Sequence, residues 1–213
     1  EAISYSSQLP NKKIAKAFFL RSIIQFEMKN YVASVFDITK AINLNNHNHL
    51  FYSHRALVQV KIENYKDAIK DFDKALEIYT NQDIDFFSIR GECKFLIKEY
   101  SSAINDFYKC IEIDNSFANA YFDIGRINLE LKKYEKAISE FDKAIDLNSN
   151  NPNYFRYRGK AYLDLSFNNE AIKNFDIAIS INSKESDFYY QRSCAKLGLN
   201  DSQGAINDLL QVL

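Results

Sequence analysis

The chain has 213 residues, a formal net charge of −1 at pH 7 and 26% charged residues. This near-neutral balance argues against binding to nucleic acid, which attracts proteins with a basic surface. No apolar run approaches the roughly 18–20 residues that a membrane-spanning helix requires. With five glycines, two prolines and no long polar tract, the composition also excludes an extended linker or a disordered segment.

Residues 1–14 precede the repeating part of the sequence and fit none of its repeats. We expect them to form an N-terminal tail or the end of a preceding repeat. Asn11, directly after Pro10, is the predicted start of the first helix.

From Ala15 onward, apolar residues recur at helical spacing in two runs per 34 residues. The clearest example is residues 118–151, where the polar pair Lys132-Lys133 separates the two runs. This pattern predicts two amphipathic helices joined by a tight turn. A step of 34 residues, with one extra residue at Asp83, divides the sequence into six repeats: 15–48, 49–82, 84–117, 118–151, 152–185 and a shortened 186–213.

Three positions, numbered from the first residue of each repeat, alternate small and large side chains. Such an alternation lets two helices approach closely, with the large side chains filling the space between them. Position 20 is Ser34, Ala68, Ala103, Ala137, Ala171 and Ala205; position 24 is Ile38, Phe72, Phe107, Phe141, Phe175 and Leu209; position 27 is Ala41, Ala75, Cys110, Ala144, Ala178 and Val212.

The stretch Ala137-Ile-Ser-Glu-Phe141, followed by Ala144, resembles the tetratricopeptide repeat (TPR), which has a 34-residue period and an Ala-x3-Phe core. The resemblance covers residues 15–213. It implies an all-α, right-handed superhelical solenoid of six antiparallel helix pairs. The proline that the family has near position 32 is absent, and Asn46, Thr80, Asn115, Ser149 and Ser183 stand in its place. These polar residues also form turns and caps, so the fold is expected to survive.

Position 7 is usually leucine in the family, but here it is Arg21, Arg55, Arg90, Ile124, Arg158 and Arg192. Position 23 is aspartate in four repeats, at Asp37, Asp71, Asp106 and Asp208. Because position 7 packs inward in the family, we predict structural ion pairs between the two helices of a repeat. The alternative is a ladder of arginines that faces a ligand.

In TPR proteins, positions 2, 5, 6, 9, 12 and 13 line a concave groove that contacts the ligand. The resemblance implies an apolar patch in the first repeat, which includes Phe19 and Ile23. It also implies a basic, aromatic patch in repeats four to six, formed by Phe122, Arg126, Arg156, Tyr157, Lys160 and Tyr190. Arginine and tyrosine commonly anchor interfaces, so we expect this patch to prefer an acidic or phosphorylated segment.

Two alternatives compete with these groove assignments. The apolar patch around Phe19 and Ile23 is equally suited to packing against residues 1–14 or a preceding repeat. Asp123 lies close to the basic patch in the sequence and is placed to neutralise Arg126 or Arg156 within the protein.

Other site chemistries find little support in the sequence. The residues with which chaperone-tail binders of this family hold a terminal carboxylate have no counterpart here. His47, His49 and His54 have no cysteine beside them, so we expect no metal site. No nucleophile–histidine set shares a face and no Gly-rich phosphate loop exists, so we expect neither catalysis nor a cofactor. The odd cysteine count (Cys93, Cys110 and Cys194) favours a reducing, cytoplasmic environment.

The sequence therefore predicts a non-enzymatic scaffold that binds a peptide segment or a helix of a partner protein. One rival hypothesis is a helical arm or regulatory domain of a larger enzyme. Another is a structural protein that self-assembles through its C-terminal edge. That edge is apolar, and no later helix follows it to cover Leu209, Leu210, Val212 and Leu213.

Overall fold

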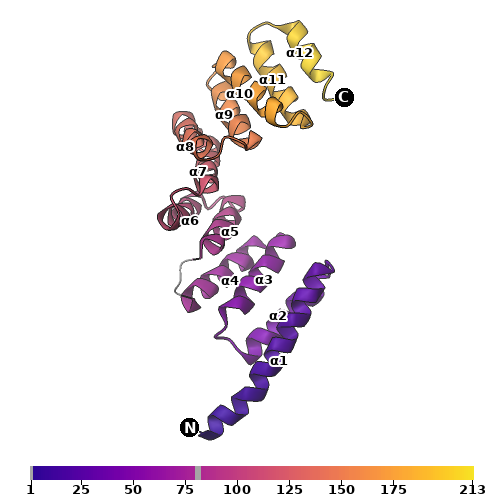
Figure 1. Ribbon diagram of the computed structural model, residues 1–213, viewed down its shortest axis with the longest axis vertical. Coiled ribbons are helices and arrows are strands. Elements are labelled where there is room, and N and C mark those ends of the chain that lie inside the picture. The colour runs from indigo at the N-terminus through magenta and orange to yellow at the C-terminus, as the bar shows by residue number, and fades with distance from the viewer. Residues whose placement is uncertain (1, 80–82) are drawn as a thin grey trace. The chain divides into compact units, whose positions relative to one another are not determined.

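A computed structural model describes residues 2–79 and 83–213, with side chains from Asn11 onward. Within these ranges all regular structure is helical, as the sequence predicts (Figure 1). The helices are α1 (Ala2–Glu27), α2 (Tyr31–Leu44), α3 (His49–Lys61), α4 (Tyr65–Ile78), α5 (Ile84–Leu96), α6 (Tyr100–Ile113), α7 (Ala118–Glu130), α8 (Tyr134–Leu147), α9 (Pro152–Asp164), α10 (Asn168–Ile181), α11 (Ser186–Gly198) and α12 (Ser202–Leu209).

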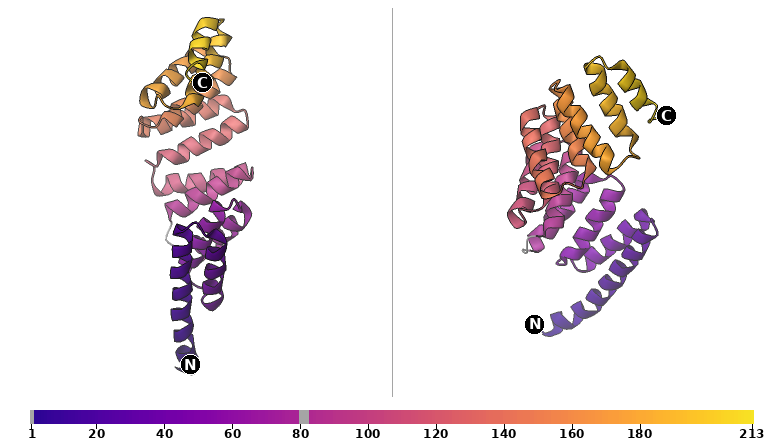
Figure 2. Two further views of the ribbon diagram at one scale, coloured as in Figure 1. Left: turned by 90° about the vertical axis from the view of Figure 1, so that its right-hand side faces the viewer. Right: turned by 45° about the horizontal axis from the view of Figure 1, so that its top comes forward.

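Successive helices pack as pairs, α1–α2 and α3–α4 in the N-terminal part and α7–α8, α9–α10 and α11–α12 in the C-terminal part (Figure 2), and the fold is that of an all-α helical repeat solenoid. The odd-numbered helices from α3 onward begin at His49, Ile84, Ala118, Pro152 and Ser186, and we propose that each opens one repeat. The chain divides into two compact halves, residues 1–106 and 107–213, and the division falls within α6. Each half is described by itself below.

A left-handed residue ends the first helix of every pair. Position 15 has a positive φ in all six repeats, at Lys29, Glu63, Lys98, Lys132, Ser166 and Asn200. In repeat four the N–H of Lys133 bonds to the carbonyl of Asn128, and the N–H of Lys132 bonds to that of Leu129. This is a Schellman arrangement, which satisfies the free carbonyls of a helix end and turns the chain into the next helix. It makes the tight turn without glycine or proline.

The core consists of the alternating small and large positions predicted from the sequence. Ala137, Phe141 and Ala144 are all fully buried, and their equivalents in the other repeats from two to five are buried as well. The helices approach so closely that a Cβ built on Gly125 would lie 2.5 Å from a ring carbon of Phe141. Because this spacing leaves no room for a larger side chain, the first and second helices of a repeat have a fixed register.

Both ends of the described chain differ from the sequence-based expectation. Helix α1 begins at Ala2 and continues through Pro10, whereas the predicted helix start was Asn11 (Figure 1). Pro10 has no backbone donor, but the residues on both sides of it are helical. At the other end α12 stops at Leu209, and residues 210–212 form a turn. None of the described helices is long and apolar enough to cross a membrane.

Candidate functional site

The arginines at position 7 form the predicted ion pairs. In four repeats, Nε and Nη2 of the arginine donate to the two carboxylate oxygens of the aspartate sixteen residues later, at distances between 2.5 and 2.9 Å. The pairs are Arg21–Asp37, Arg55–Asp71, Arg90–Asp106 and Arg192–Asp208. The aspartate side chains are 3–7% exposed. A pair held by two parallel hydrogen bonds fixes the orientation of both side chains in addition to its charge attraction. These arginines therefore have a structural role, holding the two helices of a repeat together.

Four of the arginines at position 7 also bond to the preceding repeat, a contact that the sequence did not predict. The third nitrogen, Nη1, donates to a side chain at position 25 of the repeat before. Its acceptors are Thr39 for Arg55, Asp73 for Arg90, Asp142 for Arg158 and Asp176 for Arg192. One guanidinium therefore joins the two helices of its own repeat to the second helix of the preceding repeat.

Repeats four and five vary this pattern. Repeat four has Ile124 at position 7, and this side chain is 2% exposed. In repeat five, Arg158 Nε donates to the amide oxygen of Asn174 at 2.7 Å, and the Asn174 amide donates in turn to the Glu170 carbonyl. The buried polar group is thus satisfied without a second carboxylate.

Four of the predicted groove residues form one cluster in the C-terminal half. The guanidinium of Arg126 lies over the rings of Phe122 (5.7 Å) and Tyr157 (6.0 Å). The guanidinium of Arg156 lies 4.3 Å from the centre of the Tyr157 ring. The two rings meet edge to face, with centroids 5.1 Å apart. Cation–π and edge-to-face contacts of this kind pre-organise long side chains that would otherwise lose entropy on binding.

Both arginines of the cluster also have an acidic partner. Arg126 donates to Asp123 at 2.8 Å, so the neutralisation considered in the sequence analysis is observed for this arginine. Arg156 pairs instead with Asp187, at position 2 of the next repeat, at 2.7 Å. Asp187 also accepts from the Gln191 amide at 2.8 Å. The pattern within one repeat does not point to Asp187, because this pair connects two successive repeats.

Two buried polar atoms beside this cluster lack partners among the described residues. They are Nε of Arg156, a donor, and Oε1 of Gln191, an acceptor. Both side chains bond to Asp187 through other atoms. A buried polar atom without a partner costs free energy, so this place favours a group that supplies both an acceptor and a donor.

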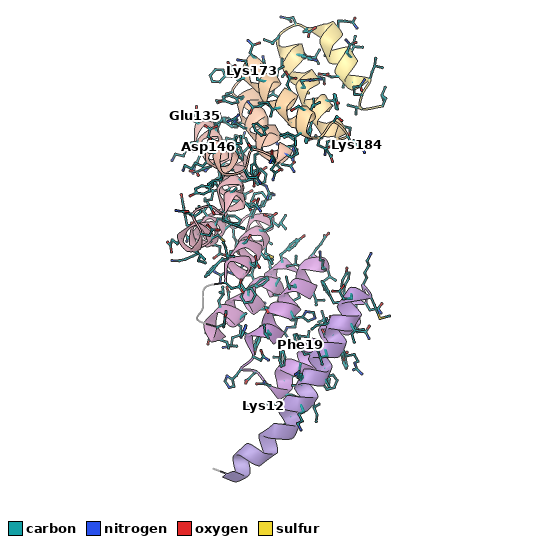
Figure 3. The ribbon with its side chains drawn as sticks, in the orientation of Figure 1. Lys12, Phe19, Glu135, Asp146, Lys173 and Lys184 are labelled. Carbon is teal, nitrogen blue, oxygen red and sulfur yellow. The ribbon has the colours of Figure 1, made fainter. Side chains whose placement is uncertain are left out.

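The remaining predicted groove residues lie outside this cluster of Phe122, Arg126, Arg156 and Tyr157. Tyr190 is 53% exposed, and Lys160, half-buried, forms no ion pair with the described residues. Phe19 and Ile23 lie in the N-terminal half, away from the C-terminal cluster in the chain. Phe19 faces α3, with its ring 5.0 Å from that of Phe51 (Figure 3).

His54 lies next to this N-terminal patch. Its ring meets those of Phe19 and Phe26, and one ring nitrogen is 3.0 Å from the Ser22 hydroxyl. Burial lowers the pKa of His54, and the hydrogen bond to Ser22 opposes this effect only in part. The ring is therefore neutral near pH 7 and contributes to packing.

Cys93 and His49 are both held in packing contacts. Cys93 is 1% exposed, and burial raises the pKa of its thiol to about 12, which makes it a poor nucleophile at neutral pH. His49 stacks on Tyr79 with ring centroids 4.3 Å apart. Within residues 2–79 and 83–213, no group of three or more His, Cys, Asp or Glu side chains is arranged to hold a metal ion.

Comparisons with known proteins agree with this architecture. Residues 125–166 match a family model described as TPR repeat, and residues 60–82 match the SHNi-TPR model. No curated protein matches the sequence significantly.

Many solved structures share the fold. A TPR protein from Parabacteroides merdae has a TM-score of 0.82 and 16% identity, over 94% of this chain and 79% of that one. The MamA protein has a TM-score of 0.74 and 19% identity, over 82% and 95% of the two chains. YrrB, a TPR protein with an unusual peptide-binding site, has a TM-score of 0.62 and 19% identity, over 82% and 90%.

Identities this low show the fold alone, and the similarity to the TPR family rests on the two model matches together with the repeat architecture. The paired helices and the Ala-x3-Phe core of repeats two to five agree with those matches. Two segments of the chain therefore match tetratricopeptide repeat models, and the chain shares its fold with TPR proteins.

Proposed function

We propose that this protein-interaction scaffold binds an extended peptide segment or a helix on one face of its C-terminal half. The face consists of Phe122, Arg126, Arg156, Tyr157, Lys160 and Tyr190, on α7, α9 and α11, and is called the arginine–tyrosine face below. The observation that supports it best is the stack in which Tyr157 contacts Phe122 and two guanidinium groups. The peptide-binding site of the similarly folded YrrB is consistent with the proposal.

The composition of the face suits a peptide ligand. Tyrosine buries a large area with few freely rotating bonds, and both arginine and tyrosine are enriched among the residues that dominate binding energies at interfaces. The unpartnered donor on Arg156 and acceptor on Gln191 complement the carbonyl and N–H of a peptide bond.

The charges favour an acidic ligand, although modestly. Arg126 and Arg156 each share their charge with a carboxylate of the protein, so a ligand carboxylate competes with Asp123 and Asp187. Lys160 has no such competitor among the described residues. An acidic or phosphorylated side chain near Lys160 and Arg156 therefore gains charge-assisted hydrogen bonds, which salt weakens.

The first prediction tests this face. A ligand is selected from a library of twelve-residue peptides, and its affinity is measured by calorimetry at low and high salt. The double substitution Arg156→Ala/Lys160→Ala is expected to weaken binding by roughly tenfold or more, because it removes charge-assisted bonds and a contact to Tyr157. Binding to the unsubstituted chain is expected to weaken as salt rises.

The matched control is Lys173→Ala/Lys184→Ala, which removes two exposed lysines outside the face (Figure 3). It is expected to leave the affinity within a factor of two at a given salt concentration. Equal affinities for all variants, without salt dependence, would show that the peptide does not bind at the arginine–tyrosine face. The apolar patch at Phe19 and Ile23 is our second choice, and Ile23→Ser tests it.

A second proposed activity is self-association through the C-terminal edge. Leu210 is 60% exposed, Ile206 is 50% exposed and Leu213 is fully exposed, so an apolar strip remains uncovered at this end of the described chain. Exposed apolar strips of this kind commonly mark contact surfaces.

The second prediction follows from this strip. The chain is expected to associate as its concentration rises, because contact between copies removes Leu210 and Leu213 from water. Leu210→Lys/Leu213→Lys is expected to remain monomeric, as measured by sedimentation velocity over a wide concentration range. Ser139→Lys, on an exposed face of α8, is the control. A monomeric unsubstituted chain at every concentration would refute self-association.

The proposal includes no catalytic role, and the cytoplasmic location stays a prediction.

A further inference from the structure

The first repeat exposes a position that every other repeat buries. Position 10 is Ile24 in repeat one, and this side chain is 58% exposed. Its equivalents in the five later repeats are 0–1% exposed: Val58, Cys93, Ile127, Ala161 and Ala195. An apolar side chain that is buried five times and exposed once marks a surface that is built to be covered.

The buried equivalents show what covers this position. Cys93 packs in one cluster with Ala68 and Phe72, which are at positions 20 and 24 of the preceding repeat. Ala161 likewise packs with Ala137 and Phe141. Ala195 packs with Ala171 and Phe175. In each case the cover is the second helix of a repeat, which presents a small residue and, four residues later, a phenylalanine.

Arg21 likewise lacks one of the polar contacts that the equivalent arginines make. Its Nε and Nη2 bond to Asp37, but within the described chain its Nη1 has no acceptor. The Nη1 atoms of its four equivalents each bond to the residue that directly follows position 24 of the preceding repeat. The Arg21 side chain is 58% exposed, against 14–21% for those four arginines.

A cavity lies beside this arginine. It has a volume of about 290 Å³ and is lined by Ile14, Ala17, Phe18 and Arg21. Arg21 lies over the Phe18 ring at 5.4 Å, which matches the distance between Arg90 and Phe87 in repeat three. The arginine–aromatic pair is therefore already formed before any helix covers it. We call Ile14, Ala17, Phe18, Arg21, Ile24 and Met28 the N-terminal face.

The spacing of this face suits a helix as its partner. Ile14, Ala17, Arg21, Ile24 and Met28 are separated by three, four, three and four residues, which places them in one stripe along α1 and the turn that directly follows it at Met28. Ile14 and Met28, at its ends, are 47% and 64% exposed. A stripe of this length accepts about four turns of a second helix.

We propose that the N-terminal face docks an amphipathic helix of a partner protein that carries a small residue, an aromatic residue four positions later and an acidic residue directly after that. The aromatic residue packs on Ile24, and the carboxylate accepts a hydrogen bond from Arg21 Nη1. The exposed Lys12, Lys13 and Lys16 on the same helix add to the preference for an acidic partner. This surface is distinct from the arginine–tyrosine face.

A second copy of this chain fits the face less well. Helices α4, α8 and α10 have the required sequence, but the following repeat already covers them. Helix α12 is exposed at its edge, but it offers Leu209 and Leu210 where an aromatic and an acidic residue are needed. Docking α12 would leave Arg21 Nη1 without its carboxylate.

The third prediction uses a peptide with the sequence of α4, residues 65–78, in which Asp73 pairs with Arg90 in the folded chain. Because isolated helices of this length are marginally stable, a covalent staple joins positions 66 and 70, which are exposed. We expect saturable binding by fluorescence anisotropy. NMR shifts are expected at Ile24, Met28 and the Nε–H of Arg21.

Two substitutions in the peptide provide the matched comparison. Asp73→Asn is expected to weaken binding by about tenfold, because it removes the charge that Arg21 Nη1 recognises. Asp71→Asn changes the net charge equally, but position 23 faces the first helix of its own repeat, so the effect is expected to stay within twofold. Equal affinities for the three peptides would refute recognition of the acid by Arg21.

Substitutions in the protein complete the test. Ile24→Ser is expected to weaken peptide binding at least fivefold with little effect on folding, because the side chain is exposed. Val32→Ser, 84% exposed and outside the N-terminal face, is the control. Arg156→Ala/Lys160→Ala is expected to leave this binding unchanged, which keeps the test independent of the arginine–tyrosine face.

Two further outcomes would overturn the proposal. One is the absence of saturable binding, or NMR shifts confined to other surfaces. The other is self-association of the free chain that Ile24→Ser abolishes, which would identify a second copy as the occupant of the face.

Discussion

Asp106→Ala is expected to lower the free energy of unfolding by about 3–5 kcal/mol, the cost of leaving buried charge without its partner. Asp106 is 3% exposed and accepts two hydrogen bonds from Arg90, at 2.5 and 2.9 Å. It also pairs with Lys94 at 2.9 Å. The Arg90 and Lys94 side chains are only 14% and 13% exposed, so water replaces the lost carboxylate poorly. Urea unfolding followed by circular dichroism measures the loss.

Asp73→Ala is the matched control for this prediction. It removes the other carboxylate bonded to Arg90, but Asp73 is 55% exposed and its loss is expected to cost about 1 kcal/mol or less. The double substitution Arg90→Leu/Asp106→Leu is expected to recover part of the loss, since Ile124 occupies position 7 in repeat four without a charge. If Asp106→Ala proves no worse than Asp73→Ala, the pair contributes nothing to stability.

The contrast between these two aspartates shows what the sequence predicts well. The pairing of position 7 with position 23 lies within one repeat, so its spacing of sixteen residues recurs and is visible in a single sequence. The same is true of the alternating small and large core positions, because their packing depends on two adjacent helices joined by a short turn.

Contacts between repeats were harder to predict, although part of the signal was present. Position 25 is aspartate in three repeats, at Asp73, Asp142 and Asp176, and each accepts from an arginine of the next repeat. The recurrence is visible in the sequence, but assigning the partner requires the stacking of successive repeats. Position 2 is aspartate in only two repeats, at Asp85 and Asp187, so no regular recurrence in the sequence identified Asp187 as the partner of Arg156.

The continuation of α1 through Pro10 was missed for a different reason. Proline favours the first turn of a helix, so the sequence pattern placed the helix start next to it. Residues 1–14 lie outside the 34-residue repeats, so the repeat period does not constrain where α1 begins. The helix start at Ala2 could therefore not be read from the repeat pattern.

Ala137→Leu is expected to lower the free energy of unfolding by about 1–3 kcal/mol, because it overpacks the closest contact between two helices. Ala137 is fully buried in a cluster with Leu129, Phe141 and Ala161. The Phe141 ring cannot yield toward α7, since a Cβ at Gly125 would already lie 2.5 Å from it. The added atoms must therefore push α8 away from its neighbours.

Ser139→Leu adds a leucine to the same helix at an exposed position and is expected to change stability by no more than about 0.5 kcal/mol. Comparing the thermal midpoints of the two variants separates packing from helix propensity, because each variant adds one leucine to the N-terminal half of α8. A midpoint for Ala137→Leu equal to that of the unsubstituted chain would mean that position 20 has free space beside it. The register that places position 20 against the first helix would then be wrong, and with it the alignment of the six repeats on which the N-terminal face and the arginine–tyrosine face were both defined.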